Sequence, residues 1–461
     1  MRSDKLDTLL NKHILILGYG REGISTHRFL RKYFPNKKIY IADKKHVSTD
    51  DPGASIICGE KYLDNLTNFE LVFRTPGVSP RLPEIVNALE SGVEFTSQTQ
   101  LFFDLCGGTV IGVTGTKGKS TTTSLIGKIL SDVGMDVEVV GNIGRPCLDY
   151  LDENWGSGKY FAFELSSHQL SDVKISPQVA IFLNIFREHL DYYDSYHDYF
   201  QAKARITKYQ AEGDLFVYNF DFGEIVDLAK QTNARTKSFS LQEKRGDCYY
   251  SQDKVILRDS GGGHELIDCS DIKLMGVHNI NNVMAASLVG QWFGVSTASL
   301  RKSISSFEPL ADRLDFVGKF GNIEFYCDAL ATIPEATVAA IDVFAGRLGG
   351  LIVGGLDRSG LDFSALAKRI LEENLDIVVL FPETGGKIYK EMARITKNLP
   401  KCENVRTMAE AVKLCYSFVG KGKVCLLSSA SPSFNLFEDY RDKSRQFRES
   451  ILKEENMCVF G

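Results

Sequence analysis

Lys119 and Ser120 close a loop of alternating glycines that follows an apolar strand and opens a helix, in the stretch TVIGVTGTKGKSTT at residues 109–122. Glycine lets the backbone approach an anion without a Cβ in the way, and the amides of the turn and of the helix N-terminus point at it. Lys119 would contact the β- and γ-phosphates of a nucleotide, and the Ser120 hydroxyl would bind Mg²⁺. Val113 stands where the usual pattern has its first glycine, so we predict a variant phosphate loop.

Two apolar strands further along the chain end in polar side chains, within KYFAFELSSHQL and PQVAIFLNIFREHLDYY. Ligands of open α/β sheets gather at the carboxyl ends of the strands. We therefore expect these side chains near the Lys119 loop: Glu164, Ser166, His168, Asn184 and His189.

Gly18, Gly20 and Gly23 form a second glycine motif, G-x-G-x-x-G, after the apolar residues 14–17, and Asp43 ends the next strand. This spacing is typical of a site for a nucleotide diphosphate, because it combines a tight turn, close backbone approach and a helix N-terminus. We favour a UDP-type group there. NAD or FAD, and a turn with a purely structural role, are the alternatives.

Apolar strands alternate with helical segments in three blocks, which predicts α/β domains with doubly wound parallel sheets. A length of 461 residues agrees with three domains at about 150 residues each. We predict a Rossmann-like nucleotide domain over 1–106, a P-loop ATPase-like domain over 107–308 with a β-rich elaboration at 214–272, and a Rossmann-like α/β domain over 309–461.

The composition is that of an ordinary globular chain, with 43% hydrophobic and 25% charged residues. A net charge of −5 argues against a nucleic-acid or anionic-membrane partner. The chain has no apolar run of about 18 residues and no signal-peptide core at its start, and its ten cysteines form no CxxC pair. We expect a cytoplasmic monomer with reduced thiols and small-molecule substrates.

Taken together, the motifs resemble those of the Mur ligases, the ATP-dependent amide-forming enzymes of peptidoglycan synthesis. The resemblance covers essentially the full length and is carried by GVTGTKGKS, FELSSHQL, LNIFREHLDYY, FQAKARI, GVHNINNVMAA, LADRLD with YCDALATIP, and LLSSASPSFNLFEDYRDKSRQFR. The chain looks most like the glutamate-adding branch. This implies ADP-forming ligation of glutamate to UDP-N-acetylmuramoyl-L-alanine through an acyl phosphate, in the biogenesis of the cell wall that sets cell shape and allows division.

The resemblance also implies which residues act on ATP. The implied catalytic residues are Lys119, Glu164, His189 and Lys203. Two Mg²⁺ ions would be held by Ser120, Glu164, His189 and a carbamylated Lys203. ATP would be bound by Gly115, Thr116, Lys117, Gly118, Lys119, Ser120, Thr121, Asn279, Asn282, Arg313 and Asp328. Three of the implied metal ligands also have an ordinary alternative. Glu164 could be a strand-end carboxylate, His189 a surface imidazole and Lys203 a solvated helix lysine.

The same resemblance implies the two other substrate sites. The UDP-sugar would contact Gly18, Tyr19, Gly20, Gly23, Asp43, Lys44, Thr75, Pro76, Gly77, Asn142, Ser166 and Gln169. Glutamate would be held by Thr332, Arg358, Ser433, Phe437 and Tyr440. Hydroxyl donors and a guanidinium fork suit the two carboxylates of glutamate.

The glutamate region departs from the branch pattern at two places. The chain reads D-A-L-A-T-I-P from Asp328 where the usual sequence is D-S-K-A-T-N-P, so Leu330 replaces a lysine. Arg358 stands where a lysine is common, and the two cations bind carboxylates differently. We predict a rebuilt pocket that takes D-glutamate, with L-glutamate as the alternative.

Three more distant functions remain as alternatives. A folylpolyglutamate synthetase-like ligase has no separate N-terminal nucleotide domain, which HILILGYGREG provides here. An NAD-dependent oxidoreductase would leave GTKGKS without a role, and a non-catalytic nucleotide-binding regulator would not need Glu164, His189 and Lys203.

Overall fold

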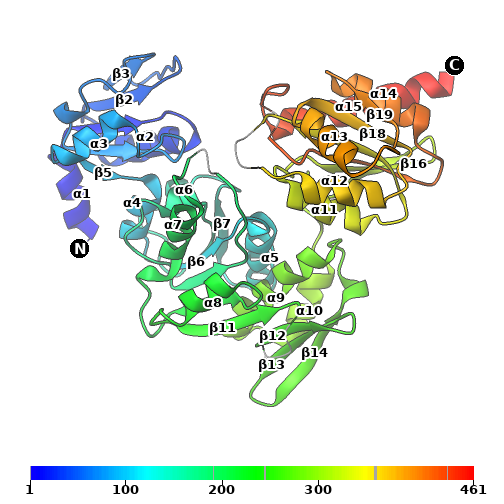
Figure 1. The fold of residues 1–461 in the computed structure, drawn as a ribbon. Coiled ribbons are helices and arrows are strands. Elements are labelled where there is room, and N and C mark those ends of the chain that lie inside the picture. Colours follow the sequence, from blue (N-terminus) through cyan, green and yellow to red (C-terminus); the bar gives the residue numbers. More distant parts are fainter. Residues whose placement is uncertain (1, 190–191, 243–245, 358–360, 433, 461) are drawn as a thin grey trace. The chain divides into compact units, whose positions relative to one another are not determined.

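The computed structural model describes residues 2–189, 192–242, 246–357, 361–432 and 434–460 (Figure 1). The chain divides into two compact units. The first unit comprises Met1–Ile185, His197–Asp271 and Asn281–Ser305, and the second comprises Phe186–Tyr196, Ile272–Ile280 and Ser306–Gly461. Three sheets lie within the three predicted ranges, two in the first unit and one in the second. The predicted α/β class is confirmed, and the exact domain boundaries stay a prediction.

The N-terminal sheet is five-stranded and parallel, in the order β3-β2-β1-β4-β5. Its strand order reverses between β1 and β4, which is where doubly wound sheets bind nucleotides. The strands are β1 Ile14–Leu17, β2 Ile39–Asp43, β3 Ala54–Cys58, β4 Leu71–Arg74 and β5 Glu94–Thr96. The helices are α1 Arg2–Leu10, α2 Arg21–Tyr33, η1 Leu66–Asn68, α3 Pro83–Glu90 and α4 Gln98–Leu105.

The central sheet has nine strands in the order β14-β13-β12-β11-β10-β9-β6-β8-β7. Strand β6, which leads into the phosphate loop, is fully buried beyond its first residue and lies between β9 and β8. The strands around it are β6 Thr109–Thr114, β7 Val137–Gly141, β8 Tyr160–Glu164 and β9 Val179–Phe182. The helices of this region are α5 Lys119–Asp132, η2 Cys147–Tyr150, α6 Ser167–Leu170 and α7 Tyr196–Lys208.

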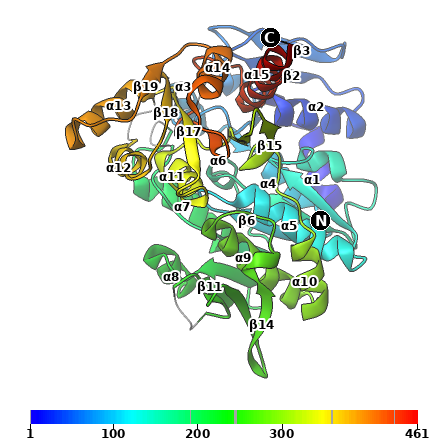
Figure 2. The same ribbon diagram turned by 90° about the vertical axis from the view of Figure 1, so that its right-hand side faces the viewer.

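The β-rich segment after residue 214 extends the same sheet, as predicted. Strands β12, β13 and β14 form an antiparallel end to an otherwise parallel sheet, and the β13–β14 hairpin is its edge (Figure 2). These strands are β10 Leu215–Asn219, β11 Arg235–Ser240, β12 Cys248–Ser251, β13 Lys254–Asp259 and β14 Gly262–Asp268. The helices are α8 Gly223–Ala229, η3 Cys269–Asp271, α9 Val277–Trp292 and α10 Thr297–Ser305.

The C-terminal sheet has the order β15-β16-β20-β17-β18-β19, with only β15 antiparallel. One hydrophobic cluster packs α11, α12 and α13 against one face, and another packs α14 and α15 against the opposite face (Figure 1). The strands are β15 Asp315–Phe320, β16 Ile323–Asp328, β17 Leu348–Gly355, β18 Ile377–Glu383, β19 Cys402–Asn404 and β20 Val424–Ser428. The helices are α11 Pro334–Val343, α12 Ser364–Glu372, α13 Thr384–Ile395, α14 Met408–Phe418 and α15 Tyr440–Phe460.

Among the described helices, none has the length and apolar character needed to cross a membrane. The nine cysteines whose side chains are described are free thiols, in agreement with the reduced state expected from the sequence.

Candidate active site

The phosphate loop is held in place by Asn184, at the end of β9. The Lys117 amide donates to Asn184 Oδ1 at 2.8 Å, and Asn184 Nδ2 donates back to the Lys117 carbonyl at 3.0 Å. The Thr116 amide donates to the Asn184 carbonyl oxygen at 3.0 Å. The sequence placed Asn184 near this loop, and the hydrogen bonds show that it fixes the loop's backbone.

Gly118 is the N-cap of α5 and has a φ of +85°, a conformation that favours glycine. A Cβ on Gly118 would lie 2.2 Å from Asn282 Oδ1, so the loop and α9 approach too closely for a side chain. Lys119 Nζ donates to the carbonyl oxygens of Gly115 and Thr116, at 3.1 and 3.0 Å. Ser120 follows in the first turn of α5 and is buried, as is Thr121.

Glu164 is the last residue of β8 and pairs in register with Val113 of β6, so it lies at the strand end beside the phosphate loop. The side chain is buried, and Oε2 has no hydrogen-bond partner among the described residues. An unpartnered buried carboxylate oxygen is costly, and a hard oxygen of this kind is a ligand that Mg²⁺ prefers. Glu164 and Ser120 therefore fit the ion that the sequence predicted.

The described ranges contain no cluster of three or more His, Cys, Asp or Glu side chains that could hold a metal alone.

Lys203, on α7, is 2% exposed, so the solvated-lysine alternative is wrong. Its Nζ donates to the Gly115 carbonyl oxygen at 2.8 Å and lies 4.8 Å from the ring centre of Tyr199. The Tyr199 hydroxyl lies 3.1 Å from Thr116 Oγ1. Lys203 thus contacts the phosphate loop, and its role at a metal and its carbamylation stay predictions.

The glycine turn after β1 is closely packed at Gly23 and open at Gly20. A Cβ on Gly23 would lie 2.1 Å from the Gly18 carbonyl oxygen, whereas a Cβ on Gly20 would meet no atom within 4 Å. The chain itself therefore requires glycine at 23, and the space at Gly20 is open to a ligand. The Tyr19 amide donates to Asp43 Oδ2 at 2.7 Å, which joins the turn to the end of β2.

A hydrogen-bonded chain that the sequence did not reveal supports this turn. The Tyr19 hydroxyl lies 2.7 Å from His27 Nδ1, and His27 Nε2 lies 2.7 Å from Asp51 Oδ2. Arg31 Nη2 donates to the same Asp51 oxygen at 2.6 Å. Burial would raise the pKa of Asp51, but hydrogen bonds from the Gly53 amide, Arg31 and His27 lower it below its ordinary value.

The other predicted UDP-sugar residues lie around this turn and on α6. Thr75 follows β4, and its amide donates to the Leu17 carbonyl at 2.9 Å. Ser166 and Gln169 form the capping box of α6, and Gln169 Nε2 also donates to Glu22 Oε1 at 2.8 Å. Pro76 lies half-buried after β4; the exposed members are Lys44, Gly77 and Asn142.

Several predicted residues belong to the second unit. The unit boundary falls within α9 after Ile280, so Asn279 is in the second unit and Asn282 in the first. His189 Nε2 lies 3.9 Å from Glu188 Oε2, and Asp328 Oδ2 accepts from Ser428 Oγ at 3.0 Å. Arg313 also lies in this unit. The roles of these residues at ATP stay predictions.

The predicted glutamate residues are all in the second unit. Thr332 Oγ1 donates to Glu188 Oε1 at 3.2 Å. Phe437 is buried in the core with its ring 5.6 Å from that of Phe381, and Tyr440 begins α15. Arg358 and Ser433 lie outside the described residues.

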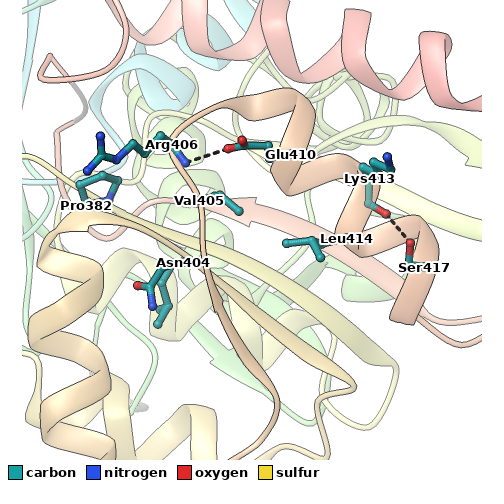
Figure 3. A pocket seen from close by; sticks show the side chains of 9 residues that line it. Pro382, Asn404, Val405, Arg406, Glu410, Lys413, Leu414 and Ser417 are labelled. Atoms are coloured by element: carbon teal, nitrogen blue, oxygen red, sulfur yellow. Dashed lines mark hydrogen bonds between the residues drawn. The ribbon is translucent and has the colours of Figure 1, made fainter.

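Two cavities lie apart from these residues. One, of about 510 Å³, is in the first unit beside His13, at the end of β1 opposite Gly18. The other, of about 710 Å³, lies at the ends of β18 and β19 beside α14. Arg406 and Lys413 lie at its opposite ends, and Glu410 accepts from the Arg406 amide at 3.0 Å (Figure 3). Its polar groups do not converge, so it is a poor candidate for catalysis.

Comparisons with known proteins identify a family for this chain. Residues 113–290 match the Mur ligase middle domain. MurF from Acinetobacter baumannii has a TM-score of 0.62 at 17% identity, over 97% of this chain and 98% of that one, and this likeness shows the fold alone. The chain belongs to the Mur ligase family.

Within that family the chain is similar to the members that add D-glutamate. It is 34% identical over 410 residues to the UDP-N-acetylmuramoylalanine–D-glutamate ligase of Acetivibrio thermocellus, which covers 85% of this chain and 84% of that protein. It is 31% identical over 458 residues to the ligase of the same name from Clostridium botulinum, over 96% and 97% of the two chains.

Proposed function

We propose that the protein is an ATP-dependent, ADP-forming ligase that joins D-glutamate to UDP-N-acetylmuramoyl-L-alanine in peptidoglycan synthesis. Identity of 30–34% to ligases of that name over most of the chain supports the substrates. The observation that carries the chemistry is the buried Oε2 of Glu164 beside the phosphate loop, which has no hydrogen-bond partner in the described part of the chain. We expect the enzyme to act as a monomer in the cytoplasm.

The reaction has to activate a carboxylate, which is a poor electrophile. Transfer of the γ-phosphoryl group of ATP to the alanyl carboxylate gives an acyl phosphate, and the protein's task in such a transfer is positioning and charge neutralisation. Loop amides would hold the phosphates, and Lys119 would exchange its two carbonyl partners for phosphate oxygens. Mg²⁺, when bound, would neutralise charge on the phosphate oxygens.

The metal ligands that we propose are those that the resemblance to the Mur ligases implies. Ser120 and Glu164 would hold one ion, and His189 with a carbamylated Lys203 would hold a second. Carbamylation turns the Lys203 ammonium into an anion, which suits a buried position beside a metal ion better than a positive charge does.

The sugar nucleotide would place its diphosphate on the open side of the Gly20 turn, and Asp43 would accept from the ribose. The amine of glutamate then attacks the acyl phosphate, and the tetrahedral intermediate expels phosphate. His189 would stabilise the charge that develops on that intermediate.

Leu330 bears on the choice of amino acid. It is half-buried and supplies no charge, so the carboxylates of glutamate would depend on Thr332, Arg358, Ser433 and Tyr440. A ligase that takes L-glutamate is the second candidate, because this rebuilt pocket differs from the common pattern of the branch.

The test is ADP release by the purified protein with ATP, Mg²⁺ and UDP-N-acetylmuramoyl-L-alanine, comparing D-glutamate with L-glutamate. ADP formation that needs both D-glutamate and the sugar nucleotide supports the proposal. Turnover with L-glutamate alone would move the assignment to the second candidate. No ADP with any muramoyl acceptor and amino acid would overturn the ligase itself.

A further inference from the structure

Glu22 lies in the first turn of α2, within the glycine turn between Gly20 and Gly23. Its backbone carbonyl accepts from Gln98 Nε2 at 3.0 Å, and its Oε1 accepts from Gln169 Nε2 at 2.8 Å. Its Oε2 is buried and has no hydrogen-bond partner within the described ranges. The carboxyl group is therefore fixed on one side and unsatisfied on the other.

Four charged or titratable groups from different segments interact electrostatically with Glu22. They are Arg21 on α2, Arg74 at the end of β4, Asp172 after α6 and Cys147 on η2. Both arginines have other partners, because Arg21 Nη2 donates to the Gly144 carbonyl at 2.6 Å and Arg74 forms an ion pair with Asp172. Neither cation is therefore dedicated to the Glu22 carboxylate.

Burial raises the pKa of Glu22 to about 7, against the lowering effect of the Gln169 hydrogen bond and of Arg21. The protonated and ionised forms are then both populated near neutral pH. Small changes in the electrostatic potential at the carboxyl group therefore change the ratio of the two forms.

A sugar nucleotide bound as proposed above would bring two negative charges to the N-terminus of α2. Helix N-terminal amides attract such an anion, but an ionised carboxylate in the same first turn repels it. The unsatisfied Oε2 makes the neutral carboxyl the less costly form once a second anion is present.

We propose that Glu22 is a positioning residue that takes up a proton when a diphosphate-bearing sugar nucleotide binds at the N-terminus of α2. The inference rests on the proposed function and adds proton uptake to substrate binding. One solvent proton forms an O–H bond on the carboxyl group, whose charge changes from −1 to 0. Gln169 keeps its contact with Oε1 in both forms.

The experiment is calorimetric titration of the full chain with UDP-N-acetylmuramoyl-L-alanine, which has no group that ionises between pH 6 and 8. Repeating each titration in buffers of different ionisation enthalpy counts the protons taken up. If the diphosphate prefers the protonated form about tenfold, binding is about fivefold tighter at pH 6 than at pH 8. Net proton uptake would accompany binding at pH 7.

Glu22→Gln keeps an oxygen for Gln169 and removes the titration, so its affinity should not change between pH 6 and 8. Glu84→Gln is the matched control, because Glu84 is an exposed residue in the first turn of α3. The control should keep the pH dependence of the unmodified protein.

The outcomes separate the two proposals. Binding by the unmodified protein with no proton uptake, or proton uptake that persists in Glu22→Gln, overturns the role of Glu22 and leaves the ligase proposal intact. Absence of sugar-nucleotide binding at every pH overturns the proposed function and this inference with it. Even if the variant fails to fold, binding by the unmodified protein without proton uptake still overturns the role of Glu22.

Discussion

Lys203 Nζ lies 2.8 Å from the carbonyl oxygen of Gly115, 88 residues earlier in the chain. The contact ties α7 to the first glycine of the phosphate loop, and the Tyr199 ring lies beside the same ammonium. Burying a cation is costly unless partners offset its lost hydration. A lysine kept at such a position points to a role in the site, since a solvated helix residue would avoid that cost.

Lys203→Ala should lower ligase turnover by about 100-fold or more, as expected when a charged group at the transferring phosphoryl is removed. Short carboxylates such as acetate should restore part of the activity if a carbamate is the working form. Lys208→Ala is the control, because Lys208 is an exposed residue on the same helix. Near-normal turnover of Lys203→Ala would contradict its place at the site, and mass spectrometry showing only bare lysine in active enzyme would contradict the carbamate.

Lys119→Ala should abolish ATP-dependent turnover and leave the fold intact. Lys119 Nζ donates to two carbonyl oxygens of its own loop, which a nucleotide phosphate would replace as its partners. The expected fall is about 100-fold or more, measured as ADP release at saturating ATP. Lys128→Ala, on the same helix and in an ion pair with Asp132 at 2.9 Å, should retain the activity of the unmodified protein. Equal activity of the two variants would refute the phosphate-loop assignment.

The three-sheet α/β fold could be predicted from the sequence, because most of the buried strands are short apolar runs with a helical segment after them. The phosphate loop, Glu164 and Asn184 could be placed at strand ends by the same logic. The hydrogen bonds of these residues could not be predicted. The two hydrogen bonds between Asn184 and Lys117, for example, depend on the relative positions of residues that are 67 apart in the chain.

Glu22 and the chain from Tyr19 through His27 to Asp51 were missed for a related reason. Each residue has an ordinary local context, and its importance comes from contacts between α2 and segments far away in sequence. The division of α9 between two units also has no local signal, because helical periodicity continues across Ile280. Sequence patterns therefore predict the helix or strand on which a residue lies better than they predict the residues that it contacts.

Gly118→Ala should weaken both the fold and nucleotide binding. The residue has a φ of +85°, and a Cβ would lie 2.2 Å from Asn282 Oδ1, so the variant combines backbone strain with a clash. Gly134→Ala is a matched control, because Gly134 has a φ of +84° and open space around its Cβ position. Backbone strain at a positive φ should lower the free energy of unfolding by about 1–2 kcal/mol in both variants.

The difference between the two variants isolates the contact with Asn282. Gly118→Ala should lose about 1–3 kcal/mol more free energy of unfolding than Gly134→Ala, and it alone should lose ATP affinity. Urea unfolding and titration with ATP measure the two effects. Equal losses in the two variants would show that the loop moves away from Asn282 without cost.

The buried side chain of Lys443, in the second unit, predicts that the free energy of unfolding depends on pH. It is 1% exposed and its Nζ donates to Ser429 Oγ at 2.6 Å. Burial lowers the pKa of Lys443 from 10.5 to about 8, although Cys327, Asp328 and Asp312 favour the ammonium. The folded state therefore disfavours the charged form, and the unfolded chain binds more protons between pH 8 and 10.5.

The sign of the effect follows from that proton balance. The cost of burying the ammonium is present in full below pH 8 and is relieved as the pH rises toward 10.5, by up to about 3 kcal/mol. Lys443→Met should remove this rise, whereas Lys453→Met, at an exposed position of the same helix, should retain it. Free energies of unfolding from urea titrations at pH 8 and pH 10 measure the difference. Parallel pH profiles for the unmodified protein and Lys443→Met would show that Lys443 keeps its ordinary pKa in the folded state.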